Sequence, residues 1–259
     1  MKKENKYTLI TGGSEGIGFE LAKLFACDKN DLILIARNEE KLLTAKKYIE
    51  ENYSVKVKII VCDLSQKDGW LKIIKAVDEN KISVDNLINN AGIGGFGAFS
   101  QAVDNFENDL ININIISLTE LTKYFLKEMI KRGNGGILNV ASTAAFVGGP
   151  KMAMYYASKA YVLSLTEAIH DEVKGTGVRV SCLCPGPVKT KFQEKSGIKK
   201  SEKAKKYLMD AESVAKIGYN GYLKGKAIIV PGIKNKILIL GNKFIPRALS
   251  RKIIMNNNK

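Results

Sequence analysis

The sequence predicts a single α/β domain in which helices cover both faces of a doubly wound parallel sheet of about seven strands. Short apolar runs alternate along the chain with longer segments whose apolar residues recur at helical spacing. The run Asp31–Ala36 is apolar almost throughout, which is typical of a parallel strand buried on both faces. The chain has 259 residues, a length that suits one domain, and no internal repeat or linker interrupts it.

The elements follow one another in strand–helix order. A strand at 7–11 runs directly into glycines, and helical periodicity then marks the first helix. Further strands are expected at 31–36, 55–61, 86–89, 136–141, 178–183 and 227–230. Further helices are expected at 39–52, 67–79, 104–131, 152–174 and 211–223.

Composition excludes several classes of protein. A hydrophobic share of 45% indicates a soluble globular protein, and no apolar run approaches the ~18 residues of a membrane span. The first apolar run is too short for a signal peptide, so a cytoplasmic location is expected. The four cysteines lack metal-site spacing, and a single histidine, His170, argues against histidine triads and multi-histidine metal sites. No metal is expected.

The first strand leads into the loop Thr11-Gly12-x-x-x-Gly16-x-Gly18. Glycines at a strand–helix turn let the backbone approach a pyrophosphate, and the helix N-terminus offers N–H groups to it. A plain tight turn is the alternative, but the position at the start of a strand–helix–strand unit favours a dinucleotide site. The expected cofactor-binding residues of this loop are Gly12, Ser14, Glu15, Gly16, Ile17 and Gly18.

The end of the second strand discriminates between cofactors. An acidic residue usually holds the adenosine ribose there in NAD-binding proteins, but this chain has Ala36 followed by Arg37. A guanidinium can pair with a 2′-phosphate, so NADP(H) is favoured over NAD(H). The alternative for Arg37 is an interaction with Glu39 and Glu40 at the start of the next helix.

Two more strand ends carry candidate cofactor contacts at the carboxyl edge of the sheet. Asp63 and Leu64 close the third strand, where a carboxylate could accept a hydrogen bond from an adenine amino group, although turn initiation explains Asp63 equally well. Asn90, Ala91 and Gly92 follow the fourth strand, where simple loop chemistry is the alternative.

A phenol, an ammonium and a hydroxyl lie between Ser142 and Lys159. Tyr155 and Lys159 are four residues apart, so a helix places both on one face. A neighbouring cation is expected to lower the tyrosine pKa, which prepares the phenol for proton transfer. Ser142 ends a strand from which its hydroxyl could meet the phenol. The spacing alone is weak, because many surface helices carry it by chance.

Asn114 lies on the apolar stripe of the helix expected at 104–131, four residues from both Leu110 and Leu118. A buried amide without partners costs about 1–3 kcal/mol, so partners are expected. Two roles stay open: a structural hydrogen-bond network, or a site that holds a water in a proton path.

With these motifs together, residues 7–190 resemble the short-chain dehydrogenase/reductase family, whose domain is of the Rossmann type. The loop at Thr11–Gly18 and the segment Asn89-Asn90-Ala91-Gly92 match its cofactor motifs. Its catalytic Asn–Ser–Tyr–Lys set falls on Asn114, Ser142, Tyr155 and Lys159, with the family's usual separation of 13 residues between Ser142 and Tyr155. The family's nicotinamide contacts correspond here to Pro185, Gly186, Val188 and Thr190.

The resemblance implies hydride transfer between a nicotinamide cofactor and the carbon of a carbonyl or secondary alcohol. Tyr155 would exchange the oxygen's proton, Lys159 would lower the tyrosine pKa and hold the nicotinamide ribose, and Ser142 would orient the carbonyl. Asn114 would steady a relay water. The resemblance also implies a homodimer or homotetramer formed through the two long helices. The alternative outside catalysis is a redox sensor of the same fold that only binds NADP(H).

Finer details are similar to a bacterial branch of the family that is often called DltE-like. They lie in the segments 138–146 and 227–235. Glu15 departs from the small or basic residue that is common in NADP-preferring members, which weakens the cofactor argument.

The excess of positive charge is concentrated in the last quarter of the chain. The net charge is +15, and residues 191–259 hold 17 basic and 4 acidic residues. We expect a catalytic domain at 1–232 with a substrate loop at about 191–210, and a basic amphipathic extension at 233–259 divided by Pro246. The substrate is expected to be small, with an acidic or lipid-like part. Phe192–Tyr207, Gly94–Phe99 and Phe146 are its expected walls.

Three readings of the extension are open. It could be a cap packed on the domain with a solvated basic face, a peripheral contact with the inner membrane face, or a recruiter of acidic substrates or partners. Nucleic-acid binding is not expected, because no aromatic platform or reading helix accompanies the lysines.

Overall fold

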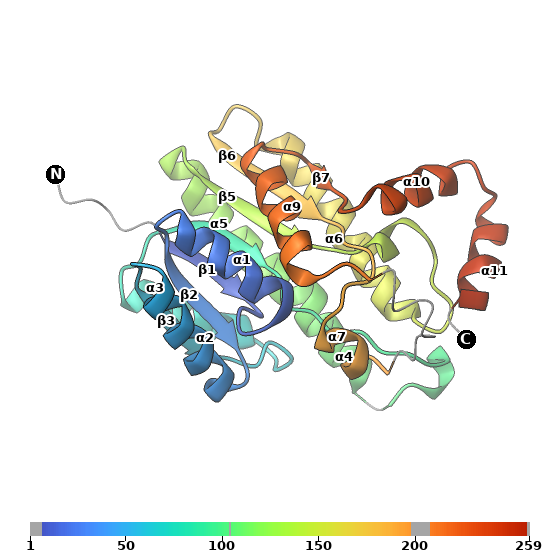
Figure 1. Cartoon of the computed structure of the whole chain (residues 1–259), viewed down its shortest axis with the longest axis horizontal. Helices are drawn as coiled ribbons and strands as arrows, with labels where there is room; N and C mark the ends of the chain where they lie inside the picture. The colour runs from blue at the N-terminus through green and yellow to red at the C-terminus, as the bar shows by residue number, and fades with distance from the viewer. Residues whose placement is uncertain (1–6, 104, 198–207, 258–259) are drawn as a thin grey trace.

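The computed structural model describes residues 7–103, 105–197 and 208–257. Within them, the predicted sheet is confirmed: seven parallel strands pair in the order β3-β2-β1-β4-β5-β6-β7 (Figure 1). The strands are β1 (Tyr7–Thr11), β2 (Asp31–Ala36), β3 (Val57–Val61), β4 (Val84–Asn89), β5 (Gly135–Val140), β6 (Val178–Leu183) and β7 (Ile228–Ile229).

Helices connect these strands in the order that the periodicity predicted. The long ones are α1 (Gly16–Cys27), α2 (Glu39–Asn52), α3 (Gly69–Glu79), α5 (Leu118–Arg132), α6 (Ala153–Glu172), α9 (Ala211–Leu223), α10 (Ile233–Asn242) and α11 (Arg247–Asn257). The short ones are η1 (Phe99–Gln101), α4 (Phe106–Ile111), η2 (Asn112–Ser117), η3 (Thr143–Phe146) and α7 (Lys191–Lys195).

Apolar clusters on the two faces of the sheet hold these layers together. On one face, α1, α2 and α9 pack on alternate strand residues such as Ile10 and Leu34. On the other face, α3, α5 and α6 pack on Leu9 and Ile33. Successive strand residues point to opposite faces, so a central strand such as β2 is apolar almost throughout, as a doubly covered sheet requires.

The connection from β3 to β4 sets the place of the site. The chain begins in the centre at β1, extends to the edge at β3, and then returns across β1 to β4. Loops therefore diverge between β1 and β4 at the carboxyl ends of the strands, which is where such sheets bind ligands.

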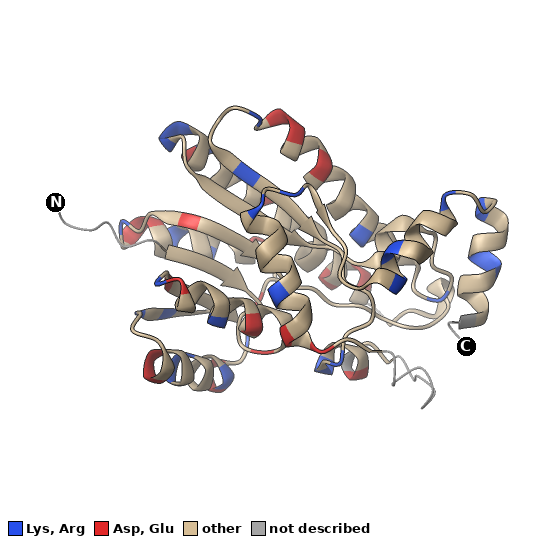
Figure 2. Cartoon of the chain, turned by 45° about the horizontal axis from the view of Figure 1, so that its top comes forward, with Lys and Arg blue, Asp and Glu red and all other residues tan. Residues whose placement is uncertain are grey.

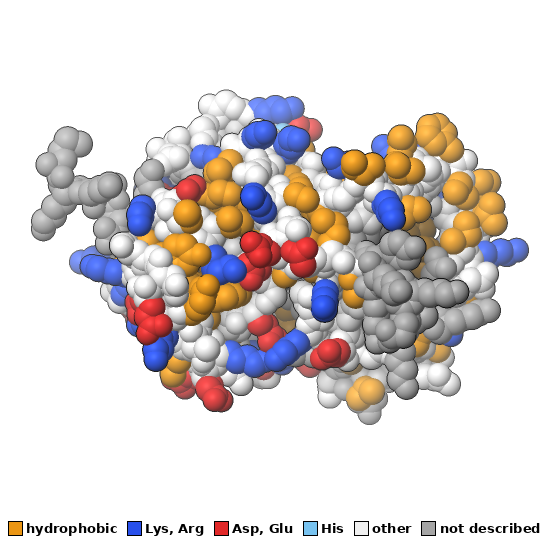
Figure 3. Space-filling view, viewed as in Figure 1, with side chains coloured by type: hydrophobic (Ala, Val, Ile, Leu, Met, Phe, Trp, Pro, Cys, Tyr) orange, Lys and Arg blue, Asp and Glu red, His pale blue; other side chains and the backbone are white. Residues whose placement is uncertain are grey.

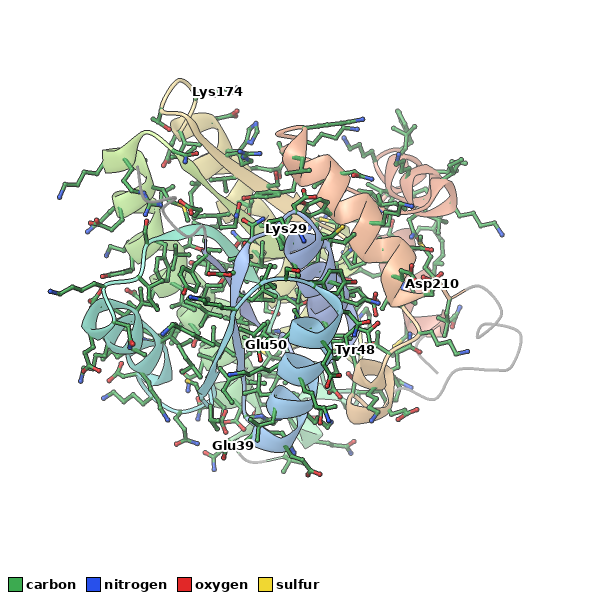
Figure 4. All side chains as sticks on the ribbon, turned by 60° about the vertical axis from the view of Figure 1, so that its left-hand side comes forward. Lys29, Glu39, Tyr48, Glu50, Lys174 and Asp210 are labelled. Carbon is green, nitrogen blue, oxygen red and sulfur yellow. The ribbon has the colours of Figure 1, made fainter. Side chains whose placement is uncertain are left out.

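Helix α2 covers the sheet edge that carries the expected adenosine end of the site (Figure 4). Its first turn contains Glu39. Glu50, near its end, accepts a hydrogen bond of 3.0 Å from the Val57 amide and so anchors α2 to β3. Tyr48 packs edge-on against Phe19 of α1, with ring centroids 5.6 Å apart.

The helix expected at 104–131 differs from the prediction. Its first residue, Asp104, lies outside the described residues, and the rest divides into α4, the π-helical turn η2 and α5. A π-turn inserts extra backbone without an interruption of the apolar pattern, so periodicity could not reveal it. Asn114 lies inside this wider turn.

The end of the chain forms two helices on either side of Pro246, as predicted. In Figure 1 they lie beside the carboxyl ends of the last strands, away from α1 and α2. The expected substrate loop begins with α7, while its part at 198–207 lies outside the described residues. The division at 232 into a catalytic domain and an extension stays a prediction.

Candidate active site

A cavity of about 1840 Å³ opens at the carboxyl edge of the sheet. It runs from the glycine loop after β1 to the helices α10 and α11. All predicted site residues line it except Gly18 and Asn114. Residues from loops and helices far apart in the chain therefore meet around one space. The position of each follows from the element that carries it.

Ser142, Tyr155 and Lys159 come together at the floor of this cavity. Ser142 follows β5, and its hydroxyl accepts a hydrogen bond of 3.1 Å from the Ala144 amide, which begins the turn η3. Helix α6 packs against this turn and carries Tyr155 and Lys159 on one face. The Lys159 ammonium donates to the Val140 carbonyl over 2.9 Å, so the lysine ties α6 to the end of β5.

Tyr155 lines the cavity, and its ring has an aromatic and a cationic neighbour. The Phe192 ring lies 5.6 Å away between centroids, and Lys159 Nζ lies 5.9 Å from the tyrosine ring centroid. Burial raises the pKa of Tyr155 to about 12, while a hydrogen bond with Ser142 acts in the opposite direction. The phenol therefore stays protonated at neutral pH in this structure.

The net pKa of Tyr155 is raised in this structure, whereas a lowered value was expected from the sequence. Removal from water disfavours the phenolate more than its neighbours favour it. The same burial acts on Lys159, which is 5% exposed, and lowers the pKa of its ammonium to about 8. Spacing in the sequence shows which charges are close but not how much water is lost around them.

Asn114 has the partners that a buried amide needs. Its Oδ1 accepts from the Ile93 amide over 2.9 Å, and its Nδ2 donates to the Ile93 carbonyl over 2.9 Å and to Ser158 Oγ over 3.0 Å. The side chain thus joins the π-turn to α6 and to the loop after β4. A network role is established, and the relay water stays a prediction.

Gly92 brings Asn114 and Lys159 close together. A Cβ atom at this glycine would lie 3.3 Å from both Asn114 Oδ1 and Lys159 Nζ. Even a methyl group here would be in tight contact with both polar groups.

The glycine loop has the backbone that a phosphate cradle needs. Gly12 and Gly16 have φ of 65° and 60°, a left-handed conformation that favours glycine. Gly18 does not line the cavity, and its role in cofactor binding stays a prediction. A Cβ atom there would lie 2.3 Å from the Gly12 carbonyl oxygen, so this glycine permits close packing of α1 on the loop.

Thr11 and Asn90 join the loop after β1 to the loop after β4. Thr11 Oγ1 accepts hydrogen bonds of 3.0 Å from the amides of Asn90 and Ala91. Asn90 Nδ2 donates in return to the carbonyls of Thr11 and Gly12, over 3.0 and 3.1 Å. These bonds hold open the crevice where the strand order reverses.

The expected adenosine end carries two cations. Arg37 Nη1 lies 3.9 Å from Asp63 Oδ2, and the arginine side chain is 60% exposed. Lys41, which sequence reasoning missed, forms a 2.8 Å ion pair with Glu15. Its position in the first turn of the helix after β2 was the available signal. The pair balances the acidic charge of Glu15 beside the loop.

The turn after β6 forms the wall opposite the glycine loop. Pro185, Gly186, Val188 and Thr190 all line the cavity. A Cβ atom at Gly186 would lie 2.5 Å from Asn235 Nδ2, so the start of α10 rests directly on this turn. The glycine loop, the crevice and this turn together could hold a dinucleotide.

The remaining wall is largely apolar. Phe96, Phe146 and Phe192 line it, as expected, together with inward residues of α10 and α11. Asn242 Nδ2 donates to the Phe146 carbonyl over 3.1 Å and fixes α10 against η3. The hydroxyl of Ser250 is buried in this wall and has no hydrogen-bond partner among the described residues.

The described part of the chain contains neither a membrane-spanning helix nor a metal-binding cluster. No helix there is long and apolar enough to cross a membrane. No group of three or more histidine, cysteine and acidic residues is arranged there to hold a metal ion.

Comparison with known proteins identifies the family. The model of the short chain dehydrogenase family matches residues 6–201, which is more than half of the chain. The chain belongs to the short chain dehydrogenase family. The resemblance seen in the sequence is thereby confirmed at the level of the family, while the DltE-like branch is not shown by these relatives.

Curated relatives of this short chain dehydrogenase include two named very-long-chain 3-oxoacyl-CoA reductases. The protein of Danio rerio (form B) is 34% identical over 193 residues, which is 73% of this chain and 61% of the relative. The chain thus matches less than two thirds of that protein's length. The protein of Rattus norvegicus is 29% identical over 260 residues, which is 98% of this chain and 80% of the relative.

Solved structures share the fold. A short-chain dehydrogenase from Sphingobium yanoikuyae in complex with NADPH has a TM-score of 0.82, is 25% identical, and matches over 97% of this chain and 96% of that one. A short chain dehydrogenase/reductase from Burkholderia phymatum in complex with NAD has a TM-score of 0.79 and is 22% identical, over 92% and 93% of the two chains. The second likeness shows the fold alone.

Proposed function

We propose that this protein is an NADP(H)-dependent oxidoreductase that interconverts a carbonyl group and a secondary alcohol. One observation carries the proposal: the Ser142 hydroxyl, the Tyr155 phenol and the Lys159 ammonium line one cavity whose far end is a glycine loop. Lys159 lies behind the phenol, and Asn114 fixes the helix turn beside it. These four residues form the proposed catalytic set.

Tyr155, Ser142 and Lys159 carry out the proton transfer in this proposal. Tyr155, with a pKa of about 12, is a donor at neutral pH and gives its proton to the carbonyl oxygen during reduction. The Ser142 hydroxyl holds that oxygen and stabilises the phenolate that remains. Lys159, still largely protonated at pH 7, favours the phenolate by its charge. A bound nicotinamide supplies or accepts the hydride.

The residues fit NADP(H) at the adenosine end. Ala36 places no carboxylate at the end of β2, and Arg37 follows it with an exposed guanidinium. Lys41 adds a second cation at this end of the cavity. Its ion pair with Glu15 offsets the negative charge of that residue, which in the sequence disfavoured NADP(H). Asp63, Leu64 and the loop at 90–92 would contact the adenine and ribose, and the turn at 185–190 would contact the nicotinamide.

The substrate side of the cavity favours a molecule with a long apolar part. Three phenylalanines and the isoleucines of α10 and α11 supply the surface that an acyl chain needs. The names of the curated relatives support a 3-oxoacyl thioester as the class to test first. The DltE-like branch, a homo-oligomer and a location in the cytoplasm complete the proposal; the free thiols are compatible with that location.

Oxidation of NADPH in the presence of a carbonyl panel tests the proposal. The panel contains 3-oxoacyl thioesters of increasing chain length, short ketones and aldehydes. We expect turnover that rises with chain length. Binding of NADPH without turnover of any member would favour the redox sensor and contradict the proposal.

Two variants at adjacent positions test whether the Tyr155 hydroxyl is the proton donor. Tyr155→Phe should lower turnover by at least ~10²-fold, because the proton donor is lost, while NADPH affinity stays within a few-fold. Tyr156→Phe is the matched control, since Tyr156 also lines the cavity but its hydroxyl has no role in the proposal. Stopped-flow rates and fluorescence titration of NADPH measure the two quantities. Equal loss in both variants would refute the assignment to Tyr155.

A further inference from the structure

The last two helices present an apolar surface on the outside of the molecule. We define the outer C-terminal face as the exposed large apolar residues of α10, α11 and the turn between them. Its members are Ile233, Ile237, Leu238, Leu240, Phe244, Leu249, Ile253 and Met255. Phe244 is 82% exposed, and in Figure 3 hydrophobic side chains gather over these helices on the right. Single exposed apolar residues are ordinary, but a contiguous group marks an interaction surface.

The charge on the same helices has one sign. Residues 233–257 contain six basic residues and no acidic residue, and Figure 2 shows blue without red on α10 and α11. Among the described residues, Lys243, Arg247 and Lys252 form no ion pair, and all three are exposed. The partner of this face therefore has to supply both apolar surface and negative charge.

The inner side of the same helices belongs to the cavity. Ile245, Ile254 and the buried Ser250 line it. Ile237, Leu238 and Ile253 are exposed at the outer face and also line the cavity. Apolar surface is thus continuous from the outside of the molecule to the inside of the candidate site.

We propose that the outer C-terminal face docks on an anionic lipid surface, so that the mouth of the cavity opens toward the lipid. A second copy of this chain would bring like charges together, because a symmetric contact pairs the face with itself. An anionic bilayer supplies negative headgroups for the cations and an apolar layer for Phe244 and Leu249. Together these features favour the lipid surface among the partners that could cover the face.

The inference extends the proposed function but does not depend on it. Docking is a binding property of the exposed residues, and none of them belongs to the proposed catalytic set. A protein that docks without turnover would contradict only the proposed function, and an active protein that does not dock would contradict only this inference.

Sedimentation of the full chain with vesicles tests the docking. Vesicles of phosphatidylcholine alone are compared with vesicles in which about a third of the lipid is phosphatidylglycerol. We expect at least ~10-fold tighter binding to the anionic vesicles, with loss of most of this gain at high salt, because the headgroup attraction is screened. Equal binding to both vesicle types would overturn the inference.

Charge-reversal variants test whether the outer C-terminal face is the surface that binds anionic vesicles. Lys243→Glu with Arg247→Glu should abolish the preference for anionic vesicles. Lys75→Glu with Lys127→Glu is the control, because it changes the net charge equally at exposed positions on α3 and α5. An equal loss in both double variants would show a general charge effect and contradict docking through this face.

Substitution of apolar residues distinguishes docking on lipid from association with a second copy of the chain. Phe244→Gln with Leu249→Gln should weaken vesicle binding, whereas Leu43→Gln with Val103→Gln, at exposed positions elsewhere, should not. A Phe244→Trp variant should show quenching by brominated lipid only in anionic vesicles. If Phe244→Gln instead dissociates a dimer, as seen by sedimentation velocity, and vesicle binding is unchanged, the face is an interface between copies and the inference is wrong.

Discussion

At the scale of the residue, Tyr155 and Lys159 show how burial changes the chemistry that spacing suggests. They are four residues apart on α6, and the ammonium was expected to lower the pKa of the phenol. Loss of water around both groups instead favours the neutral phenol and lowers the pKa of the lysine to about 8. The protonated phenol is the form that the proposed reduction needs, but its raised pKa makes it a weaker acid. The proposal therefore requires Ser142 and Lys159 to stabilise the phenolate that is left.

Lys159 makes the stability of the protein without cofactor dependent on pH. Its pKa is about 8 in the folded state and near 10.5 when unfolded, so between these values the unfolded chain binds the extra proton. Stability therefore rises with pH in this window, by up to about 1.4 kcal/mol per pH unit from this group. Below pH 8 the lysine is charged in both states, and the cost of its burial is fully present.

Urea unfolding of wild type and Lys159→Met checks this sign. The difference in unfolding free energy, wild type minus variant, should increase from pH 8 to pH 10, because methionine does not titrate. Tyr155 stays protonated over this range and does not obscure the effect. A difference that is constant with pH would mean that Lys159 keeps its proton in the folded state.

Arg37 is the residue on which cofactor choice is expected to depend. Arg37→Ala should raise the dissociation constant for NADPH by about 10-fold, because a charge-assisted contact with the 2′-phosphate is lost, and should change that for NADH little. Lys47→Ala, at an exposed position on the same stretch of chain, is the control. Titration with both cofactors measures the ratio. If the dissociation constants for NADPH and NADH rise equally, Arg37 does not determine the choice between the two cofactors.

At the scale of the element, hydrogen bonds between strand ends set the geometry of the crevice. Thr11 at the end of β1 accepts from two amides of the loop after β4, and it is 2% exposed. The π-turn η2 adds a second such link through Asn114. Each link joins segments that are far apart in the sequence, so the two walls of the site are hydrogen-bonded to one another.

Thr11→Val tests the first link. Valine has the same shape but cannot accept a hydrogen bond, so the half-buried Ala91 amide loses its partner and the Asn90 amide keeps only its bond to the Ile88 carbonyl. The unfolding free energy should therefore fall by about 1–3 kcal/mol. NADPH affinity should fall as well, since the loop after β1 loses its anchor. Thr8→Val, buried on the same strand with one side-chain contact to Asn86, is a milder control. A larger effect at Thr8 would argue against this account of the loop.

At the scale of the whole molecule, exposed apolar residues remain on the helices through which self-association is expected. Ile116 in η2, Ile130 in α5 and Tyr161 in α6 are each more than a third exposed. Thr119 and Tyr161 are joined across α5 and α6 by a 2.9 Å hydrogen bond, so these helices form one surface. A homo-oligomer through this surface stays a prediction.

Sedimentation velocity checks the oligomer. Ile116→Glu should shift the protein toward the monomer by at least ~10-fold in dissociation constant, because a charge is buried at the contact. Ile217→Glu is the matched control, since Ile217 is equally exposed but lies on α9 across the sheet. Unchanged association in the first variant would exclude this surface as the contact.

The sequence by itself determined the order and type of the elements. Apolar runs such as Asp31–Ala36 and the glycine loop are local patterns, and burial on both faces of a sheet leaves few other folds for them. The same locality explains why Ser142, Tyr155 and Lys159 could be singled out, since strand end and helix face follow from neighbours in the chain.

Only the tertiary structure decided the environment of these residues, that is, their contacts and their loss of water. The pairing of Glu15 with Lys41, the π-turn at Asn114 and the pKa of Tyr155 arise from contacts and water loss between distant segments. The extension at 233–259 shows the same division. Its sequence indicated a basic amphipathic segment, but only packing against the turn after β6 could turn one side into a cavity wall and leave the other exposed.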